Sequence, residues 1–248
     1  MNYYEKWDTI SKERWQFRDD MLNKYVGELE NAHDKCIRKV ISTFGRGLGI
    51  ASPSKFTKYM IGKHRPGRII KTIKPHTPYQ ICYYDKNNLP VYMESYGFPS
   101  QDDPNVMKRT DITYFISYNN DIWTAYFNAY KTDKINVESM LSGNYKIVRD
   151  ERGRLSGLYY ICGHDTAIIY AEEYDYSEYD NGIINCTFSY YVEGRSGASK
   201  DIPTGFKNSP LQQWKYIFYV NEKGEFICYD SYKNTNGEFV LIKKNAKK

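Results

Sequence analysis

The residues best suited to bind a charged molecule lie in one basic stretch, between Lys35 and Tyr84. It contains eleven Lys or Arg and no Asp or Glu, in a chain whose formal net charge is only +5. Arg and Lys donate hydrogen bonds to phosphate and carboxylate oxygens, and Arg can donate two at once. The stretch therefore predicts an anionic partner. The residues expected to contact it are Lys55, Lys58, Lys63, Arg65, Arg68 and Lys71.

Three kinds of partner fit this charge. An acidic protein surface would pair with the side chains directly, and nucleic acid or lipid head groups would be attracted through their phosphates. The chain itself is the third alternative, because residues 79 to 248 hold 19 basic and 22 acidic side chains. The carboxylates from Glu172 to Asp180 are the obvious internal counterpart.

Catalytic chemistry has few candidates. Only four histidines occur, and no H-E-x-x-H, G-x-S-x-G or zinc spacing is present. His164 is expected at a hairpin tip, where Cys162 or Cys186 is conceivable as a nucleophile beside it. The glycines from Gly45 to Gly49 lack the third Gly of a dinucleotide fingerprint, and they are read as a helix end. The sequence thus assigns no catalytic residue, no metal site and no cofactor.

The cysteines are read as structural thiols. Five of them are widely spaced with no C-x-x-C pair, and several lie in apolar runs where a thiol acts as a small hydrophobe. The carboxylates from Glu172 to Asp180 lack the spacing of a calcium-binding loop and are read as a solvated or internally paired face.

Composition places the chain among folded proteins. It is 41% hydrophobic and 17% aromatic, with 26 Tyr, and Tyr suits strand faces that are half buried. The N-terminus lacks the pattern of a signal peptide, and no apolar run approaches the roughly 18 to 20 residues of a membrane span. A location in the bacterial cytoplasm or in a virion is expected.

The region 1–78 is predicted to be helical with a basic linker. Apolar residues recur at three- and four-residue steps from Tyr3 to Phe44, which indicates an amphipathic helix, interrupted near Gly27. Ser52 and Pro53 favour the start of a second, short helix. Pro66, Pro75 and Pro78 mark an irregular linker after it.

From Tyr79 onward the period changes to two, and one turn recurs. An Asp or Asn is followed three positions later by Gly or Asn, beginning at Asp85, Asp150, Asn221 and Asn234. The first residue caps the turn through its side chain, and the last takes the left-handed conformation that closes a hairpin. Further hairpins are expected at Asn119-Asn120, at 163–165 and at Asn181-Gly182.

These turns delimit about ten or eleven antiparallel strands and an α+β fold. We expect the N-terminal helix or helices to pack on a large β-meander, with a helical region at 1–78 and a Tyr-rich β domain at 79–248. The strands are expected at 79–84, 89–96, 112–118, 121–130, 144–149, 154–162, 166–174, 183–193, 214–220, 225–232 and 238–243.

Two segments resemble known families. The hairpins Tyr83-Tyr-Asp-Lys-Asn-Asn-Leu89 and Val148-Arg-Asp-Glu-Arg-Gly-Arg-Leu155 resemble the turn of tyrosine-aspartate and MORN-type repeats in bacterial toxin systems, although here the copies do not follow in tight tandem. Leu48-Gly-Ile-Ala-Ser-Pro-Ser-Lys55, with Ile61-Gly62 downstream, is similar to a segment of phage tape-measure proteins and bacterial polymorphic toxins. These resemblances imply a phage or toxin-system context and carry over no catalytic residue.

The function expected is non-catalytic recognition of another macromolecule. In a bacterial setting this suits an immunity protein that blocks a toxin by occlusion, with an acidic protein as the partner and nucleic acid as an alternative. A phage virion or tail-associated structural protein is the second class. A basic nuclease-like toxin is the third, and for it no general acid or base can be assigned.

Overall fold

The computed structural model describes residues 3–21, 29, 31–45, 47–60, 66–100, 103, 105–128, 143–162, 167–191 and 211–247. Their contacts divide the chain into two compact units, Lys12–Asn144 and a second unit that joins Met1–Ser11 to Tyr145–Lys248. We call these the 12–144 unit and the 145–248 unit. The regions 1–78 and 79–248 that composition suggested remain a prediction.

The N-terminal helix is shorter than predicted. Helix α1 runs over Tyr3–Asp20, and the prediction of helix up to Phe44 is wrong because Arg38–Thr43 forms a strand, β1, that pairs with β2 (Tyr79–Tyr84). Val40, Ile41 and Thr43 are β-branched, and such side chains pack well on a pleated sheet. The expected interruption near Gly27 lies outside the described residues.

The second α-helix predicted from Ser52 does not form. Two 3₁₀ turns, η3 (Gly49–Ala51) and η4 (Thr57–Tyr59), stand in this region, after a further one, η2 (Ala32–Lys35). Ser52 follows η3 as its C-terminal cap. The hydroxyl of Ser54 accepts the Phe56 N–H at 3.2 Å, so the serine side chains stabilise local turns here.

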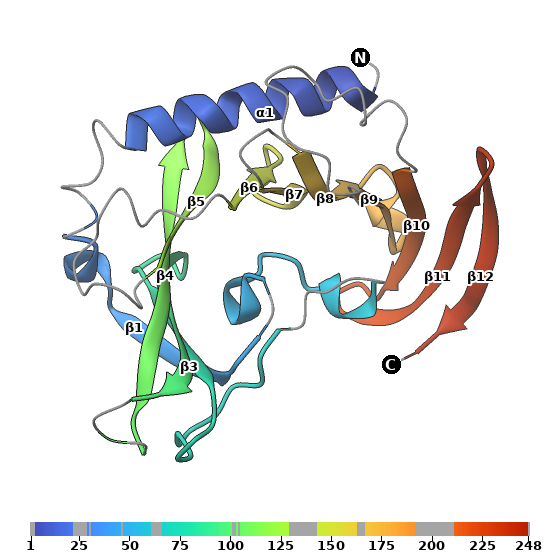
Figure 1. Cartoon of the computed structure of the whole chain (residues 1–248). Coiled ribbons are helices and arrows are strands. Elements are labelled where there is room, and N and C mark those ends of the chain that lie inside the picture. Colours follow the sequence, from blue (N-terminus) through green and yellow to red (C-terminus); the bar gives the residue numbers. More distant parts are fainter. Residues whose placement is uncertain are drawn as a thin grey trace. The chain divides into compact units, whose positions relative to one another are not determined.

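The described residues contain twelve strands, so the predicted count of about ten is too low, whereas the antiparallel sheet is confirmed. Within each unit, strands that follow one another in the sequence are hydrogen-bonded neighbours (Figure 1). The additional strand is β1. The others are β3 (Pro90–Pro99), β4 (Met107–Tyr118), β5 (Asp121–Asn128), β6 (Asn144–Arg149), β7 (Leu155–Cys162), β8 (Ala167–Asp175), β9 (Ile183–Tyr191), β10 (Leu211–Val220), β11 (Phe226–Thr235) and β12 (Glu238–Ala246).

The sheet of the 12–144 unit is covered on both faces. On one face the ring of Phe17, from α1, stacks on Trp123 at 5.2 Å between centroids and meets Tyr118 edge-on at 5.3 Å. On the other, Ala51 of η3 packs against Cys82 and Met93. The prediction that the N-terminal helix packs on the sheet is therefore confirmed within this unit.

Buried aromatic rings form the core of the 145–248 unit. Phe188 of β9 and Trp214 of β10 lie 5.6 Å apart between centroids, and Tyr216 and Phe218 stack on the same strand at 5.8 Å. The fully buried carboxylate of Glu172 accepts hydrogen bonds from Tyr170 and Tyr174 on either side of it in β8. Strands β10, β11 and β12 lie side by side (Figure 1).

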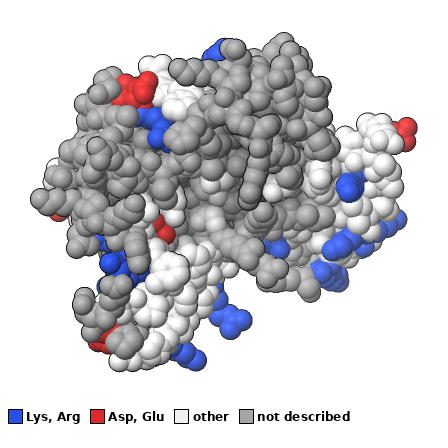
Figure 2. All heavy atoms as spheres, in the orientation of Figure 1, with Lys and Arg blue, Asp and Glu red and all other residues white. Residues whose placement is uncertain are grey.

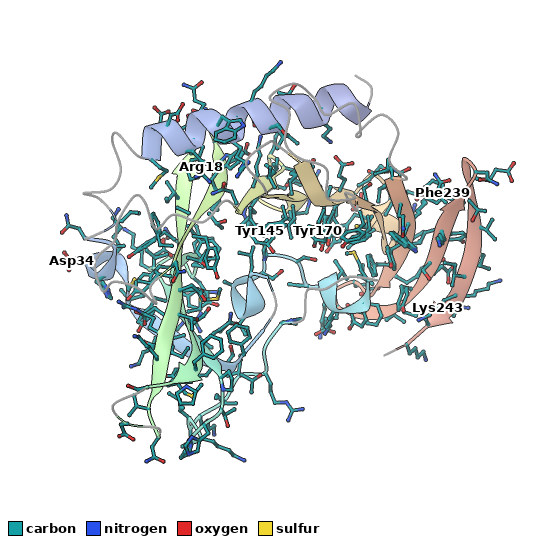
Figure 3. The ribbon with its side chains drawn as sticks, in the orientation of Figure 1. Arg18, Asp34, Tyr145, Tyr170, Phe239 and Lys243 are labelled. Carbon is teal, nitrogen blue, oxygen red and sulfur yellow. The ribbon has the colours of Figure 1, made fainter. Side chains whose placement is uncertain are left out.

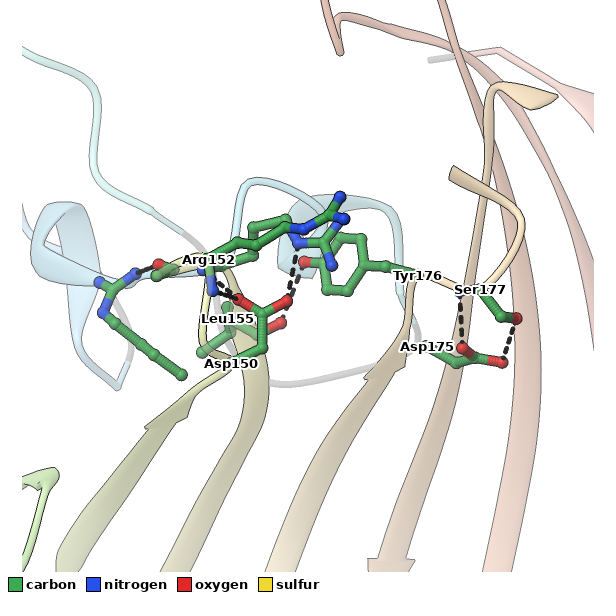
Figure 4. A network of polar contacts seen from close by, with 9 residues as sticks. Asp150, Arg152, Leu155, Asp175, Tyr176 and Ser177 are labelled. Carbon is green, nitrogen blue, oxygen red and sulfur yellow. Dashed lines mark hydrogen bonds and ion pairs between the residues drawn. The ribbon is translucent and has the colours of Figure 1, made fainter. Parts of the chain in front are cut away.

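Three of the four predicted turns share one hydrogen-bond pattern. Oδ1 of Asp85, Asp150 and Asn221 each accepts the backbone N–H groups two and four residues later, at 2.8 to 3.0 Å. The residues three positions after them have φ of 62°, 74° and 71°. Figure 4 shows the Asp150 turn, where Arg154 Nε also donates to Asp150 Oδ2 at 2.7 Å.

The fourth turn is a different one. Asn236 and Gly237 both have positive φ and join β11 to β12 as a two-residue hairpin, with Thr235 opposite Glu238. Asn119 and Asn120 close the β4–β5 hairpin in the same way. The hairpin expected at 163–165 lies outside the described residues.

Candidate protein-binding surface

The basic stretch lies within the 12–144 unit, and its described charges are exposed. Of the residues predicted to bind a partner, Lys55, Lys58, Arg68 and Lys71 are exposed, whereas Lys63 and Arg65 lie outside the described residues. The other described members are also exposed: Lys35, Arg38, Lys39 and Lys74.

Residues 67–70 are held against the outer edge of β1. The Thr43 N–H donates to the Arg68 carbonyl at 2.9 Å, and the Ile70 N–H donates to the Ile41 carbonyl at 3.0 Å. The Arg68 N–H donates in turn to the Thr43 hydroxyl at 2.9 Å. Gly67 permits this approach, since a Cβ there would lie 2.0 Å from the Thr43 carbonyl oxygen. This part of the predicted irregular linker is therefore hydrogen-bonded to β1.

Large apolar side chains are exposed between these charges. Ile37 stands between Lys35 and Arg38 with 72% of its surface exposed, and Ile69 follows Arg68 with 68% exposed. Phe44 and Ile73 are exposed as well. We call these side chains together with the eight described basic residues the basic–apolar surface. Singly exposed apolar residues are ordinary, and these four are grouped with the basic residues because they lie among them in the sequence.

A hollow of about 600 Å³ adjoins the N-terminal end of this surface. Its floor is apolar and includes Leu29, Val91 and Ile122, while Lys35 and Asp85 contribute charge to the lining. Ile37 belongs both to the hollow and to the basic–apolar surface. The hollow is large enough to accept one or two side chains of a partner.

Within the 12–144 unit, the described residues of the basic stretch make no ion pair with a described carboxylate. Two of them lie over aromatic rings instead, Arg38 over Tyr84 at 4.5 Å and Lys58 over Tyr59 at 4.8 Å. Such contacts orient the cation over the ring and leave its other side available to an anion of a partner.

The carboxylates from Glu172 to Asp180 have partners in their own unit. Glu173 contacts Lys6 and accepts a 2.8 Å hydrogen bond from the Tyr159 hydroxyl, and Asp175 caps Ser177. Glu178 accepts a hydrogen bond from Asn185. Charge pairing between this cluster and the basic stretch stays an alternative prediction.

Three groups that could act as nucleophiles, Cys82, Cys186 and Tyr83, have raised pKa values. Burial raises the pKa of the Cys82 thiol to about 12 and raises the pKa of Cys186 well above its ordinary value. Burial, with the nearby Glu94 carboxylate, raises the pKa of Tyr83 to about 12. These side chains therefore act as packing groups and hydrogen-bond donors at neutral pH. His164 and the Cys162 side chain lie outside the described residues.

A repeated tyrosine–carboxylate contact was missed from the sequence. In β2 and β3 the Tyr83 hydroxyl donates to Glu94 at 3.0 Å, and in β10 and β11 the Tyr219 hydroxyl donates to Asp230 at 3.1 Å. The two partners of each pair have the same separation in the sequence. The sequence contains a signal for these contacts. An acidic residue followed by Ser and Tyr occurs at the same separation after the turn residues Asp85 and Asn221, as Glu94-Ser-Tyr96 and as Asp230-Ser-Tyr232.

Comparison of the chain with protein-family models, with curated proteins and with solved structures gives no match. No helix within the described residues is both long enough and apolar enough to cross a membrane.

Proposed function

We propose that this chain is a non-catalytic recognition protein that binds another protein through the basic–apolar surface, most simply as an immunity-type binder that blocks a toxin. A bacterial or phage origin is part of the proposal, and it rests on the two sequence resemblances. The partner surface would be acidic with apolar side chains among its carboxylates. No cofactor is required for such binding.

The observation that carries this proposal is the state of the basic side chains. Eight cations are exposed and make no ion pair with a described carboxylate of their own unit, in a segment without a single acidic residue. A surface of one sign raises the association rate of an oppositely charged partner and rejects partners of the same sign. It does so without any change in the protein's own structure.

The exposed apolar residues favour a protein over a nucleic acid. Phosphate backbones are bound by cations and hydrogen-bond donors, and the apolar surface of Ile37, Ile69 and Ile73 would gain little from them. A protein partner could bury these side chains, and each isoleucine fully buried contributes roughly 1.5–3 kcal/mol. Charge would then provide specificity and rate, while the isoleucines would provide affinity.

The segment is also prepared for binding. Because Arg68 and Ile70 are hydrogen-bonded to β1, ordering this part of the segment costs little when a partner arrives. Inhibition by occlusion needs only that a fixed surface covers the active site of the toxin. The structure of the binder need not supply any reacting group.

The experiment uses the purified protein products of the genes on either side of this one, and a DNA duplex of about 20 base pairs as a second probe. Titration calorimetry should show binding to one neighbouring product. Replacing Lys71 and Lys74 by Glu should weaken it at least about tenfold, since two attractive charges become repulsive. The control carries the same charge change at Lys223 and Lys247, two exposed lysines of the other unit, and should bind as the parent does.

Three results would count against this function. Tight binding of the duplex with a steep salt dependence, and none of either neighbouring product, would favour a nucleic-acid partner. Equal weakening by the 71/74 pair and by the 223/247 pair would show that net charge acts, rather than this surface. Open-ended assembly of the purified chain would instead favour the virion role.

A further inference from the structure

Strand β12 ends the described sheet, and its apolar side chains are exposed on both faces. Four consecutive residues, Phe239 to Ile242, each expose between 41% and 53% of their surface. Among the described strands, β12 pairs only with β11. Figure 3 shows Phe239 and Lys243 projecting from this strand. An exposed strand edge with an apolar run is a template for pairing with another strand.

The corresponding strands elsewhere in the chain are paired on both sides. Each Asx turn that begins at Asp85, Asp150 or Asn221 lies between the first and second strands of a set, and the third strands are β4, β8 and β12. Strand β4 pairs with β3 and β5, and β8 pairs with β7 and β9, all antiparallel.

The first and third sets share two features, although Pro99 lies opposite Met107 in the first and Thr235 lies opposite Glu238 in the third. Both contain a register shift just before the Asx turn, where Tyr84 lies opposite Pro90 and Val220 lies opposite Phe226. Arg109 of β4 donates to Glu94, and the backbone N–H of Asn245 in β12 donates to Asp230, with the same sequence separation between the two partners. Strand β12 therefore takes the place of β4 in its set, with no described counterpart of β5 beside it.

We propose that the free edge of β12 binds β12 of a second copy of this chain, antiparallel, to form a symmetric dimer with a continuous sheet. Two identical edges related by a two-fold axis meet antiparallel, which is the direction that β5 and β9 take against β4 and β8.

The charges of β12 are complementary to themselves in this arrangement. Glu238 stands at one end of the apolar run, and Lys243 and Lys244 stand at the other. Figure 2 shows acidic atoms at the tip of the β11–β12 hairpin and basic atoms further along it. When two such strands pair antiparallel about Leu241, Val240 lies opposite Ile242 of the second copy. Glu238 of each copy then lies opposite Lys244 of the other, and Lys243 lies one position further along, opposite Phe239.

An interface confined to one strand from each copy is small, so the dimer is expected to dissociate on dilution. Sedimentation velocity of the full chain between about 2 and 200 μM should show a monomer–dimer equilibrium. Leu241→Lys places like charges at the centre of the pair and should weaken association at least about tenfold. Val106→Lys is the matched control, because Val106 is equally exposed in the 12–144 unit, and it should dimerise as the parent does.

Charge reversal separates self-pairing from other effects. Glu238→Lys should weaken the dimer, because the lysine introduced in each copy then lies opposite Lys244 of the other and near Lys243. Adding Lys243→Glu and Lys244→Glu to it should restore association, since the complementarity is the same with the signs exchanged. A parent chain that stays monomeric at about 200 μM overturns the proposal. So does a dimer that Leu241→Lys and Glu238→Lys leave unchanged, or growth beyond the dimer that they do not affect.

Discussion

The Tyr83 hydroxyl and the Glu94 carboxylate, joined at 3.0 Å across β2 and β3, form a link that a third strand completes. Arg109 of β4 donates to the other oxygen of Glu94 at 2.9 Å. In the other unit Asp230 is bonded in the same way, to Tyr219 of β10 and to the Asn245 N–H of β12. A carboxylate on the middle strand thus ties three neighbouring strands together in each unit.

Replacing Glu94 by Gln tests this link. Glu94 is buried, and its negative charge offsets Arg109, so the amide would leave this partly buried cation without its counter-charge. We expect the free energy of unfolding to fall by about 1–3 kcal/mol. Urea unfolding followed by circular dichroism measures it. Glu151→Gln, on an exposed turn, is the control and should change stability by less than about 0.5 kcal/mol. Equal effects of the two changes would show that the Glu94 link contributes nothing of its own.

Alkaline pH should destabilise both units. Burial raises the pKa of Tyr83 and of Tyr176 to about 12, whereas an exposed tyrosine titrates near 10. Between these values the unfolded chain has lost protons that the folded chain retains, so stability is complete below pH 10 and falls as pH rises towards 12. Urea midpoints measured across this range should decrease, and Tyr83→Phe should make the decrease less steep. A midpoint that does not change up to pH 12 would contradict the burial of these hydroxyls.

The strands after residue 79 could be predicted because their turns are encoded locally. Asp85, Asp150 and Asn221 each form the turn with backbone groups within four residues, so no distant contact decides it. The strand of residues 38–43 could not be separated from a helix in this way. Val40 and Ile41 fit a helical spacing, and it is pairing with β2, distant in the sequence, that selects the strand.

The candidate surface could be predicted only in its charges. Exposure of Lys55, Lys58, Arg68 and Lys71 follows from the cost of burying lysine and arginine. The exposure of Ile69 does not, because nothing in the local sequence says that residues 68–70 lie along the edge of β1. The tyrosine–carboxylate links needed the register of the hairpins, which places Tyr83 and Glu94 on one face.

The turns that begin at Asp85, Asp150 and Asn221 can be tested at the residue that has positive φ. Gly153→Ala should cost about 1 kcal/mol, because φ is +74° and a Cβ there meets no other atom, so only the backbone strain is felt. Gly153→Asn should cost less, since Asn88 holds the matching position with φ of 62°. Gly182 lies outside these turns, just before β9. Gly182→Ala should cost about twice as much or more, because its Cβ would lie 2.7 Å from the Val220 carbonyl oxygen. Thermal unfolding of the three variants gives the order of their stabilities. A Gly153→Asn variant less stable than Gly153→Ala would contradict the left-handed conformation of residue 153.

The contact between Arg14 and Asn144 should anchor α1 within the 12–144 unit. Both side chains are fully buried, and Arg14 Nε donates to Asn144 Oδ1 at 2.9 Å while Asn144 Nδ2 donates to the Thr124 carbonyl at 2.8 Å. Asn144→Ala removes the acceptor of a buried cation and the partner of a buried carbonyl, so the free energy of unfolding should fall by about 2–4 kcal/mol. Amide exchange in α1 should accelerate more than exchange in β2 and β3, because the helix loses its polar anchor and the strands keep theirs.

Gln16→Ala provides the comparison, since Gln16 is exposed on the same helix and alanine favours helix formation. It should leave both the urea midpoint and the exchange of α1 close to those of the parent chain. If Asn144→Ala lowers the midpoint while α1 and β2 exchange faster by the same factor, the amide supports the unit as a whole. Its loss would then act through β5 and the Thr124 carbonyl, and the buried Arg14 would have to be held by its other contacts.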